Sequence, residues 1–178
     1  MEKKFELTDN FVINGFGIKL FQIKCTKSFK YANEGDLGGY VEKEDNLSQS
    51  GDAWVSGNAQ VSGNARVYGN ARVSGDARVS GDARVSGNAR VYGDAQVSGK
   101  ARVENNHMHC GFDCFGSCNR HTHAYKTKGN KVEITCGCFR GSLEKFEKKV
   151  EETHKGTIYE KQYKAIINLI KIKFGIDG

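Results

Sequence analysis

The middle of the chain repeats one pattern of apolar and polar residues every six positions. Valine returns from Val55 to Val103, alanine keeps the same period from Ala53 to Ala101, and glycine keeps it from Gly51 to Gly99. The repeating unit is A-R-V-S-G-(N/D). Valine favours an extended backbone, whereas Gly followed by Asn or Asp tolerates the positive φ of a sharp corner. An internal period of this kind predicts a solenoid in which each coil stacks on the next.

Three six-residue sides make a coil of 18 residues, so equivalent residues stack about 4.8 Å apart. The residue before each valine then faces outward, because neighbours on a strand point to opposite faces. A pentapeptide coil is excluded by the period of six, and collagen is excluded because the chain has no proline. The expected outer columns are Trp54, Arg72 and Arg90; Gln60, Arg78 and Gln96; and Arg66, Arg84 and Arg102.

The repeat closely resembles the hexapeptide-repeat, left-handed β-helix family. That resemblance implies the left-handed coil, since parallel β connections are otherwise nearly always right-handed. Val41 and Leu47 are also six apart, and two inserted residues separate Leu47 from the regular series at Val55. We therefore expect an irregular first coil and about three and a half to four coils in total. Left-handed β-helices often close as trimers around their flat faces, so the resemblance also implies a homotrimer.

The residues before the repeat predict a cover for the solenoid. Apolar runs surround Asn14-Gly15, which is a strong signal for a β-hairpin. The expected organisation is an N-terminal hairpin and cap in residues 1–40, a left-handed β-helix in residues 41–104, and a C-terminal α+β module in residues 105–178.

The C-terminal module is predicted to contain a β-hairpin and a helical hairpin. Alternating residues flank a turn at 128–131, and Ser142 is placed to cap a helix. The apolar stripe of a second helix consists of Tyr159, Tyr163, Ile166, Ile167, Ile170 and Phe174. The fold class is therefore expected to be mainly β, with a small α+β module after a short parallel β-helix of hexapeptide repeats.

Two segments outside the repeat extend the resemblance over most of the chain. They are GDLGGYVEKEDNLS before the repeat and ITCGCFRGSLEKFEKKVEETH after it. Both are similar to a group of hexapeptide-repeat proteins common among phage and prophage genes, which includes a bacterial group labelled as transferases. The resemblance implies a phage or prophage origin, but the label derives from the fold and does not establish chemistry.

Positive charge lies equally on the repeat and on residues 104–178, which carry thirteen basic and nine acidic side chains. The net charge is +6, and residues 53–103 carry seven basic and three acidic side chains. The arginine columns are either a solvated face balanced by aspartate, or a stripe that binds an anion or docks a protein. Two tyrosines near them either add stacking surface or pack between subunits. The candidate binding residues on the repeat are Arg66, Arg72, Arg78, Arg84, Arg90, Arg102, Tyr68 and Tyr92.

Cysteine and histidine cluster after the repeat. Cys110, Cys114, Cys118 and His121 are candidate zinc ligands, since thiolates and imidazoles are the ligands zinc prefers. Their C-x3-C-x3-C-x2-H spacing is not that of a C-x2-C knuckle, and the phage-type pattern usually lacks most of these residues. The alternative is buried small thiols with exposed histidines, and no resident cofactor.

The same module carries candidate ligand-binding residues. The stretches that match the phage-type pattern contain Ser117, Thr122, Cys136 and Cys138. A catalytic cysteine would need a base held beside it, and His154 or His121 are the available histidines.

Three classes of function remain. An acyltransferase is the commonest activity on this fold, but its catalytic histidine lies on the coils, and residues 41–103 contain no histidine. A nucleic-acid binder would use the arginine columns. We favour a non-catalytic oligomeric binding protein that takes a protein partner or a small anionic ligand, for example to antagonise a host defence system such as CRISPR. No run of about 18 apolar residues occurs, so we expect no membrane contact and a cytoplasmic location in a bacterial host.

Overall fold

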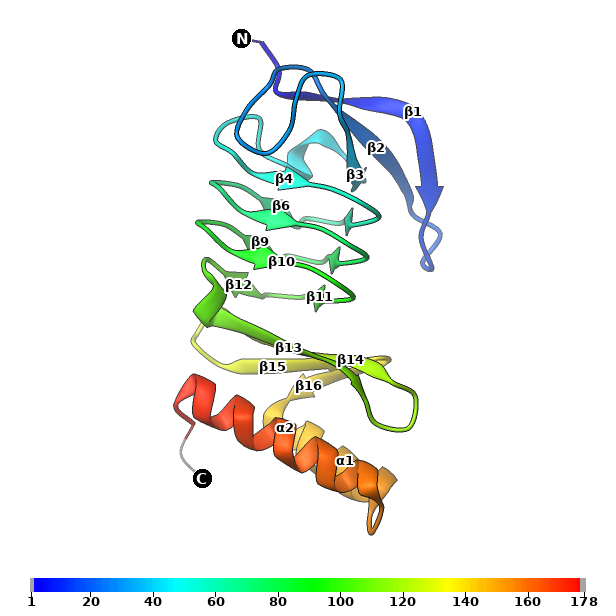
Figure 1. The fold of residues 1–178 in the computed structure, drawn as a ribbon, viewed down its shortest axis with the longest axis vertical. Helices are drawn as coiled ribbons and strands as arrows, with labels where there is room; N and C mark the ends of the chain where they lie inside the picture. Colours follow the sequence, from blue (N-terminus) through cyan, green and yellow to red (C-terminus); the bar gives the residue numbers. More distant parts are fainter. Residues whose placement is uncertain (1, 177–178) are drawn as a thin grey trace. The chain divides into compact units, whose positions relative to one another are not determined.

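The computed structural model describes residues 2–176, and the chain divides into two compact units (Figure 1). The first is Met1–Asn106 and the second is His107–Gly178. Within the described residues, the helices are too short or too polar to cross a bilayer.

A parallel β-solenoid forms most of the first unit. Its three faces are the stacks β3-β5-β8-β11, β4-β7-β10 and β6-β9-β12. Each strand pairs with the strand one coil further along, and backbone bonds such as Trp54 N–H to Ala71 O, at 3.0 Å, join the coils. The strands are β4 (Trp54–Val55), β5 (Gln60–Val61), β6 (Arg66–Val67), β7 (Arg72–Val73), β8 (Arg78–Val79), β9 (Arg84–Val85), β10 (Arg90–Val91), β11 (Gln96–Val97) and β12 (Arg102–Val103).

The interior of the solenoid consists of the two small apolar residues of each repeat. Every repeat valine and alanine is buried, with at most 3% of its surface exposed. The corner glycines have positive φ values, 58° at Gly87 and 63° at Gly93. At the corners, Asn58 Nδ2 donates to Asp76 Oδ1 at 3.1 Å and Asn64 Nδ2 donates to Asp82 Oδ1 at 3.2 Å. The expected coil and its three outer columns are confirmed. The handedness stays a prediction.

The irregular first coil is also confirmed. Val41 pairs with Val61 and Leu47 bridges to Val67, so the two inserted residues are accommodated without loss of stacking. A short 3-10 helix, η1 (Glu44–Asn46), turns the chain between these two contacts. The Asn46 side chain is fully buried. Its Nδ2 donates to the carbonyls of Gly63 and Ala65 at 3.1 and 2.8 Å, and its Oδ1 accepts from Lys43 N–H at 2.9 Å.

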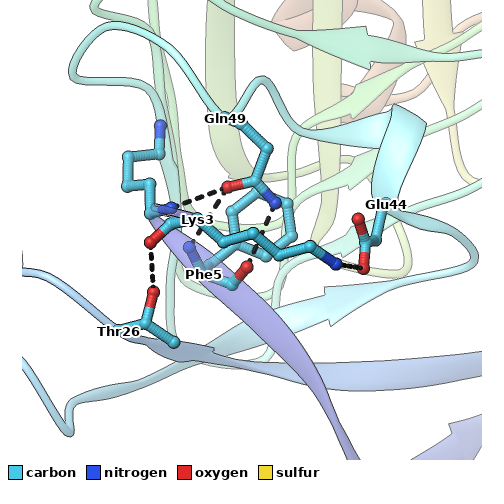
Figure 2. Close-up of polar contacts among 6 residues, drawn as sticks. Lys3, Phe5, Thr26, Glu44 and Gln49 are labelled. Carbon is cyan, nitrogen blue, oxygen red and sulfur yellow. Dashed lines mark hydrogen bonds and ion pairs between the residues drawn. The ribbon is translucent and has the colours of Figure 1, made fainter. Parts of the chain in front are cut away.

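The N-terminal strands cover the first coil, as expected. Strands β1 (Phe5–Ile13), β2 (Lys19–Cys25) and β3 (Leu37–Val41) are antiparallel neighbours, and β3 continues one solenoid face. Figure 2 shows how β1 is fixed: Gln49 accepts from Phe5 N–H at 3.3 Å and donates to Phe5 O at 3.1 Å, while Lys3 Nζ lies 2.7 Å from Glu44 Oε1. The Thr26 hydroxyl donates to Lys3 O at 2.5 Å (Figure 2).

Lys4 closes the edge of the coil. Its ammonium donates to the carbonyls of Ala53 at 2.8 Å and Gly51 at 3.2 Å. Burial lowers the pKa of Lys4 to about 8, although the nearby Asp52 and Cys25 act in the opposite direction.

The β1–β2 turn is longer than an isolated Asn-Gly turn. It spans Asn14 to Gly17, with Gly17 N–H donating to Asn14 O at 2.9 Å. The Asn14 side chain accepts from Phe16 and Ile18 N–H at 2.9 and 3.0 Å. The asparagine therefore organises the loop through its side chain, which is a common role for asparagine in turns.

The second unit is a four-stranded antiparallel sheet with two helices on one face. The strands, in order, are β13 (His109–Phe115), β14 (Arg120–Lys126), β15 (Val132–Cys136) and β16 (Phe139–Ser142). The expected hairpin is β14–β15, and the two outer strands are additions that the sequence pattern did not predict. Both expected helices are present as α1 (Leu143–His154) and α2 (Ile158–Phe174), and Ser142 caps the first by accepting from Lys145 N–H.

The core of this unit lies between sheet and helices. Helix α1 buries Leu143, Phe146 and Val150. From α2, the buried members of the predicted stripe are Tyr163, Ile166, Ile167 and Ile170.

Candidate functional site

The three outer columns of the solenoid differ in how far they are covered. Phe29 packs edge-on against Trp54, with ring centroids 5.4 Å apart, and Trp54 is only 5% exposed. The guanidinium of Arg72 lies over the Tyr31 ring, 4.8 Å from its centroid. The N-terminal segment therefore covers Trp54 fully and Arg72 in part, whereas Arg90 is exposed.

The third column consists entirely of arginine. Arg66 pairs in register with Arg84, and Arg84 with Arg102. Like charges directly opposite each other on neighbouring strands are destabilising, so an anion bound between these arginines would stabilise the column.

The arginines of the repeat are not neutralised within the described residues. None of the six forms an ion pair there. The nearby corner aspartates Asp76 and Asp82 accept hydrogen bonds from asparagines instead. The carboxylates of Asp76 and Asp82 thus bind the asparagines stacked on them at the corners. The guanidinium groups are therefore available to donate hydrogen bonds to a ligand or a partner.

A groove runs beside the upper end of the arginine column. It has a volume of about 490 Å³, and its lining includes Arg66 and Arg84 of the solenoid and Glu44 and Asp45 of η1. Tyr68, which is 37% exposed, also lines it. The groove therefore presents both signs of charge and one aromatic ring. Tyr92, 67% exposed, lies outside it.

The cavity of the second unit gathers residues that are far apart in sequence. It encloses about 550 Å³. Ser117, Cys136 and Cys138, three of the four candidate residues of this module, line it, and the Thr122 hydroxyl donates to Cys136 Sγ at 3.3 Å. The other lining residues are Cys118, Arg120, Phe139, Phe146, Lys149, Val150, Thr153, His154 and Tyr163.

Three polar side chains of the lining, those of Tyr163, Cys136 and His154, contact one another in sequence. The Tyr163 hydroxyl lies 3.7 Å from Cys136 Sγ, and the Cys136 thiol is 7% exposed. Burial raises the pKa of Tyr163 well above its usual range, and the contact with Cys136 adds to the effect. His154 stacks on the Tyr163 ring, with centroids 5.4 Å apart and planes inclined by 28°. His154, one of the two proposed bases, thus lies in the same cavity as three cysteines.

The proposed zinc ligands are not brought together. Among residues 2–176, no group of three or more His, Cys, Asp or Glu side chains is arranged to hold a metal ion. Cys110 packs against the core under the helices, where burial raises its pKa to about 11, whereas His121 contacts Asp113. Cys114 is exposed, with a φ of 61° where the pairing of β13 and β14 shifts. A spacing of four residues scatters these side chains because the segment is a strand with an irregularity followed by a turn.

Sequence reasoning missed the cationic and aromatic side of the cavity. Arg120, Lys149 and Tyr163 stand in segments that contact one another only in the folded unit. The glycine between Cys136 and Cys138 was the one sequence feature that could have indicated this side of the cavity. In the structure its φ is 57°, and a Cβ at Gly137 would lie 2.5 Å from Arg120 Nη1.

The comparisons with known proteins concern the repeat. Residues 59–75, 71–86 and 83–99 match the family model of the YdcK beta solenoid repeat. No curated protein matches the chain. The protein is a β-solenoid repeat protein.

Proposed function

We propose that the protein is a non-catalytic binding protein whose solenoid groove takes an acidic segment of a partner protein. The observation that carries the proposal is the groove itself: Arg66 and Arg84 line it without an ion pair in the described chain, and Glu44 and Asp45 line it as well.

Planar guanidinium groups favour carboxylates. An arginine presents a rigid fork of donors that matches a carboxylate with two parallel hydrogen bonds. Because Arg66 and Arg84 are in register on adjacent coils, a partner carboxylate between them would remove their mutual repulsion as well as satisfy their donors. Tyr68 adds a ring against which an apolar side chain of the partner can pack.

The mixed charge of the groove favours a protein over a nucleic acid. A phosphate backbone is uniformly negative, so the Asp45 carboxylate would repel it from a groove to which Arg66 and Arg84 attract it, whereas Glu44 is already paired with Lys3. A protein segment can place a basic residue near Asp45 and an acidic residue near the arginines.

Two finer elements of the proposal derive from the family resemblance. The first is a homotrimer, supported by the similarity of the coil to hexapeptide-repeat proteins; a monomer in light scattering at micromolar concentration would contradict it.

The second element is that the chain is a phage or prophage protein that blocks a host defence system in the bacterial cytoplasm. A gene neighbourhood of sugar-nucleotide enzymes would argue against that role and for an acyltransferase.

The binding proposal is tested with a random peptide library selected on the immobilised full-length protein. We expect enrichment of peptides rich in Asp and Glu, and loss of their binding in the Arg66→Gln/Arg84→Gln variant. The matched control is Arg78→Gln/Arg90→Gln, which removes the same charge from the other two columns. Glutamine already occupies this repeat position at Gln60 and Gln96, so the coil accepts the change.

An equal loss of peptide binding in both variants would mean that only the net charge of the solenoid matters, and it would contradict binding in the groove. Tighter binding of a short DNA duplex than of any selected peptide, with a steep dependence on salt, would favour the nucleic-acid alternative instead.

A further inference from the structure

We propose that the cavity of the second unit is a binding site for a small organic anion with a planar ring, such as an aryl phosphate or a nucleoside monophosphate. This site is independent of the solenoid groove: its lining residues all belong to His107–Gly178, whereas the groove belongs to Met1–Asn106.

The size and lining of the cavity fit a ligand of that class. Its volume of about 550 Å³ lies within the range of about 300–1,000 Å³ found for small-molecule sites. Phe139, Phe146 and Tyr163 line the cavity, with centroids 5.1 Å apart for the first pair and 5.6 Å apart for the second. Phe146 and Tyr163 are only 3% and 5% exposed, whereas Phe139 is partly exposed, so Phe139 is the ring best placed for a planar ligand to stack on.

The charged groups of the lining are all basic. Arg120 and Lys149 line the cavity, and no carboxylate does. Arg120 forms no ion pair within residues 2–176, whereas Lys149 is 3.8 Å from Glu152 on the surface of α1. Arg120 is therefore the group best placed to accept an anion, because its donors are not already used by a carboxylate.

The Arg120 side chain lies close to the backbone of Gly137. The side chain crosses Gly137, where an added Cβ would meet Arg120 Cδ at 2.7 Å and Nη1 at 2.5 Å. Gly137 is the middle of the Cys136-Gly-Cys138 turn, so the turn leaves room for the guanidinium directly over the backbone.

The inner polar groups add donors rather than charge. The Tyr163 hydroxyl remains protonated in the physiological range, since burial and the Cys136 contact raise its pKa. The neutral hydroxyl can donate a hydrogen bond that orients the ligand without repelling an anion, as a carboxylate would.

Two exposed cysteines provide the readout. Cys118 and Cys138 line the cavity and are exposed, whereas Cys114 is exposed in the same unit but lies outside the lining. A bound ligand should slow alkylation of Cys118 and Cys138 by iodoacetamide and leave Cys114 unchanged. Mass spectrometry of peptides from the full-length protein measures the three rates side by side.

The probes separate the parts of the proposed ligand. We expect phenyl phosphate and adenosine monophosphate to protect Cys118 and Cys138 at lower concentration than inorganic phosphate, which lacks the ring, or benzamide, which lacks the charge. Benzoate distinguishes a carboxylate from a phosphate as the preferred anion. Equal protection by inorganic phosphate or benzamide, or no protection by any ring-bearing anion at millimolar concentration, would overturn the proposal.

Variants test the role of Arg120. Arg120→Gln should weaken protection by phenyl phosphate at least tenfold, and Arg120→Lys, which keeps the charge and most of the stem over Gly137, should weaken it less. The control is Arg140→Gln, which removes the same charge from the same sheet at a residue already paired with Glu133 at 3.0 Å. Equal weakening by the Arg140 variant would contradict a specific role for Arg120.

Discussion

Two corner glycines of the solenoid allow steric exclusion to be separated from backbone strain. Gly87 and Gly93 have nearly the same φ, 58° and 63°. A Cβ added at Gly87 would lie 2.2 Å from Glu104 O, whereas a Cβ at Gly93 would have no atom within 4 Å. Alanine at either position therefore strains the backbone similarly, and only at Gly87 does it also collide with the next coil.

The expected costs follow from these contacts. The left-handed backbone costs an alanine about 1 kcal/mol at either position. At Gly87, the displaced Glu104 carbonyl would add about 1–3 kcal/mol of overpacking. The same carbonyl accepts from Asn88 N–H at 3.2 Å, and weakening that bond would cost about 1 kcal/mol. We thus expect Gly87→Ala to lower the free energy of unfolding by about 3–5 kcal/mol and Gly93→Ala by about 1 kcal/mol.

The assay is urea unfolding monitored by tryptophan fluorescence. Trp54 is the only tryptophan, and it is 5% exposed in the first unit, so its emission reports on the solenoid. Equal destabilisation by the two substitutions would refute the reasoning, because it would mean that coil-to-coil contact at the corner does not restrict the residue there.

Three further predictions concern buried polar and titratable groups. Asn46→Ala should lower the free energy of unfolding by about 3 kcal/mol or more in the same urea assay, because three hydrogen bonds of a buried amide are lost together. A decrease of less than about 1 kcal/mol would contradict this prediction. The pKa of Lys4 is about 8 in the folded protein and 10.5 ordinarily, so the unfolded chain binds more protons between pH 8 and pH 10.5. The free energy of unfolding should therefore rise with pH across that window, and the Lys4→Gln variant should lack the rise. Identical pH profiles for the two proteins would contradict the assignment. Cys110, whose pKa is raised to about 11, should react with iodoacetamide far more slowly than the exposed Cys114, and equal rates in peptide mass spectrometry would show that it is not buried as described.

The solenoid was predictable because every constraint on it is local and repeated. The period of six fixes the corners, the inward valines and the stacking of Arg66 on Arg84, and no long-range information is needed. The covering of Trp54 by Phe29 was not predictable, because an irregular segment with no pattern of its own supplies the cover.

The C-terminal unit was only partly predictable. The hairpin β14–β15 and both helices carry clear alternation or a helical stripe, whereas β13 contains Gly111, Asp113 and two cysteines and becomes a strand by pairing with β14. The cavity escaped prediction for the same reason: Arg120, His154 and Tyr163 meet only after the sheet and helices pack. The spacing of the cysteines and His121 suggested a metal site. In the structure, the irregular pairing of β13 with β14 separates these side chains, and the sequence spacing alone does not reveal that irregularity.

The central claim, that Arg66 and Arg84 form the binding surface of the solenoid, is tested most directly by calorimetric titration with an acidic peptide selected on the protein. Each charge-assisted hydrogen bond lost should cost about 1.5–3 kcal/mol, so Arg66→Gln/Arg84→Gln should weaken binding by more than about tenfold. Arg78→Gln/Arg90→Gln should change the affinity by less than about threefold, as expected for distant exposed charges. Unchanged affinity in the Arg66→Gln/Arg84→Gln variant, or an equal loss in the two variants, would contradict the account.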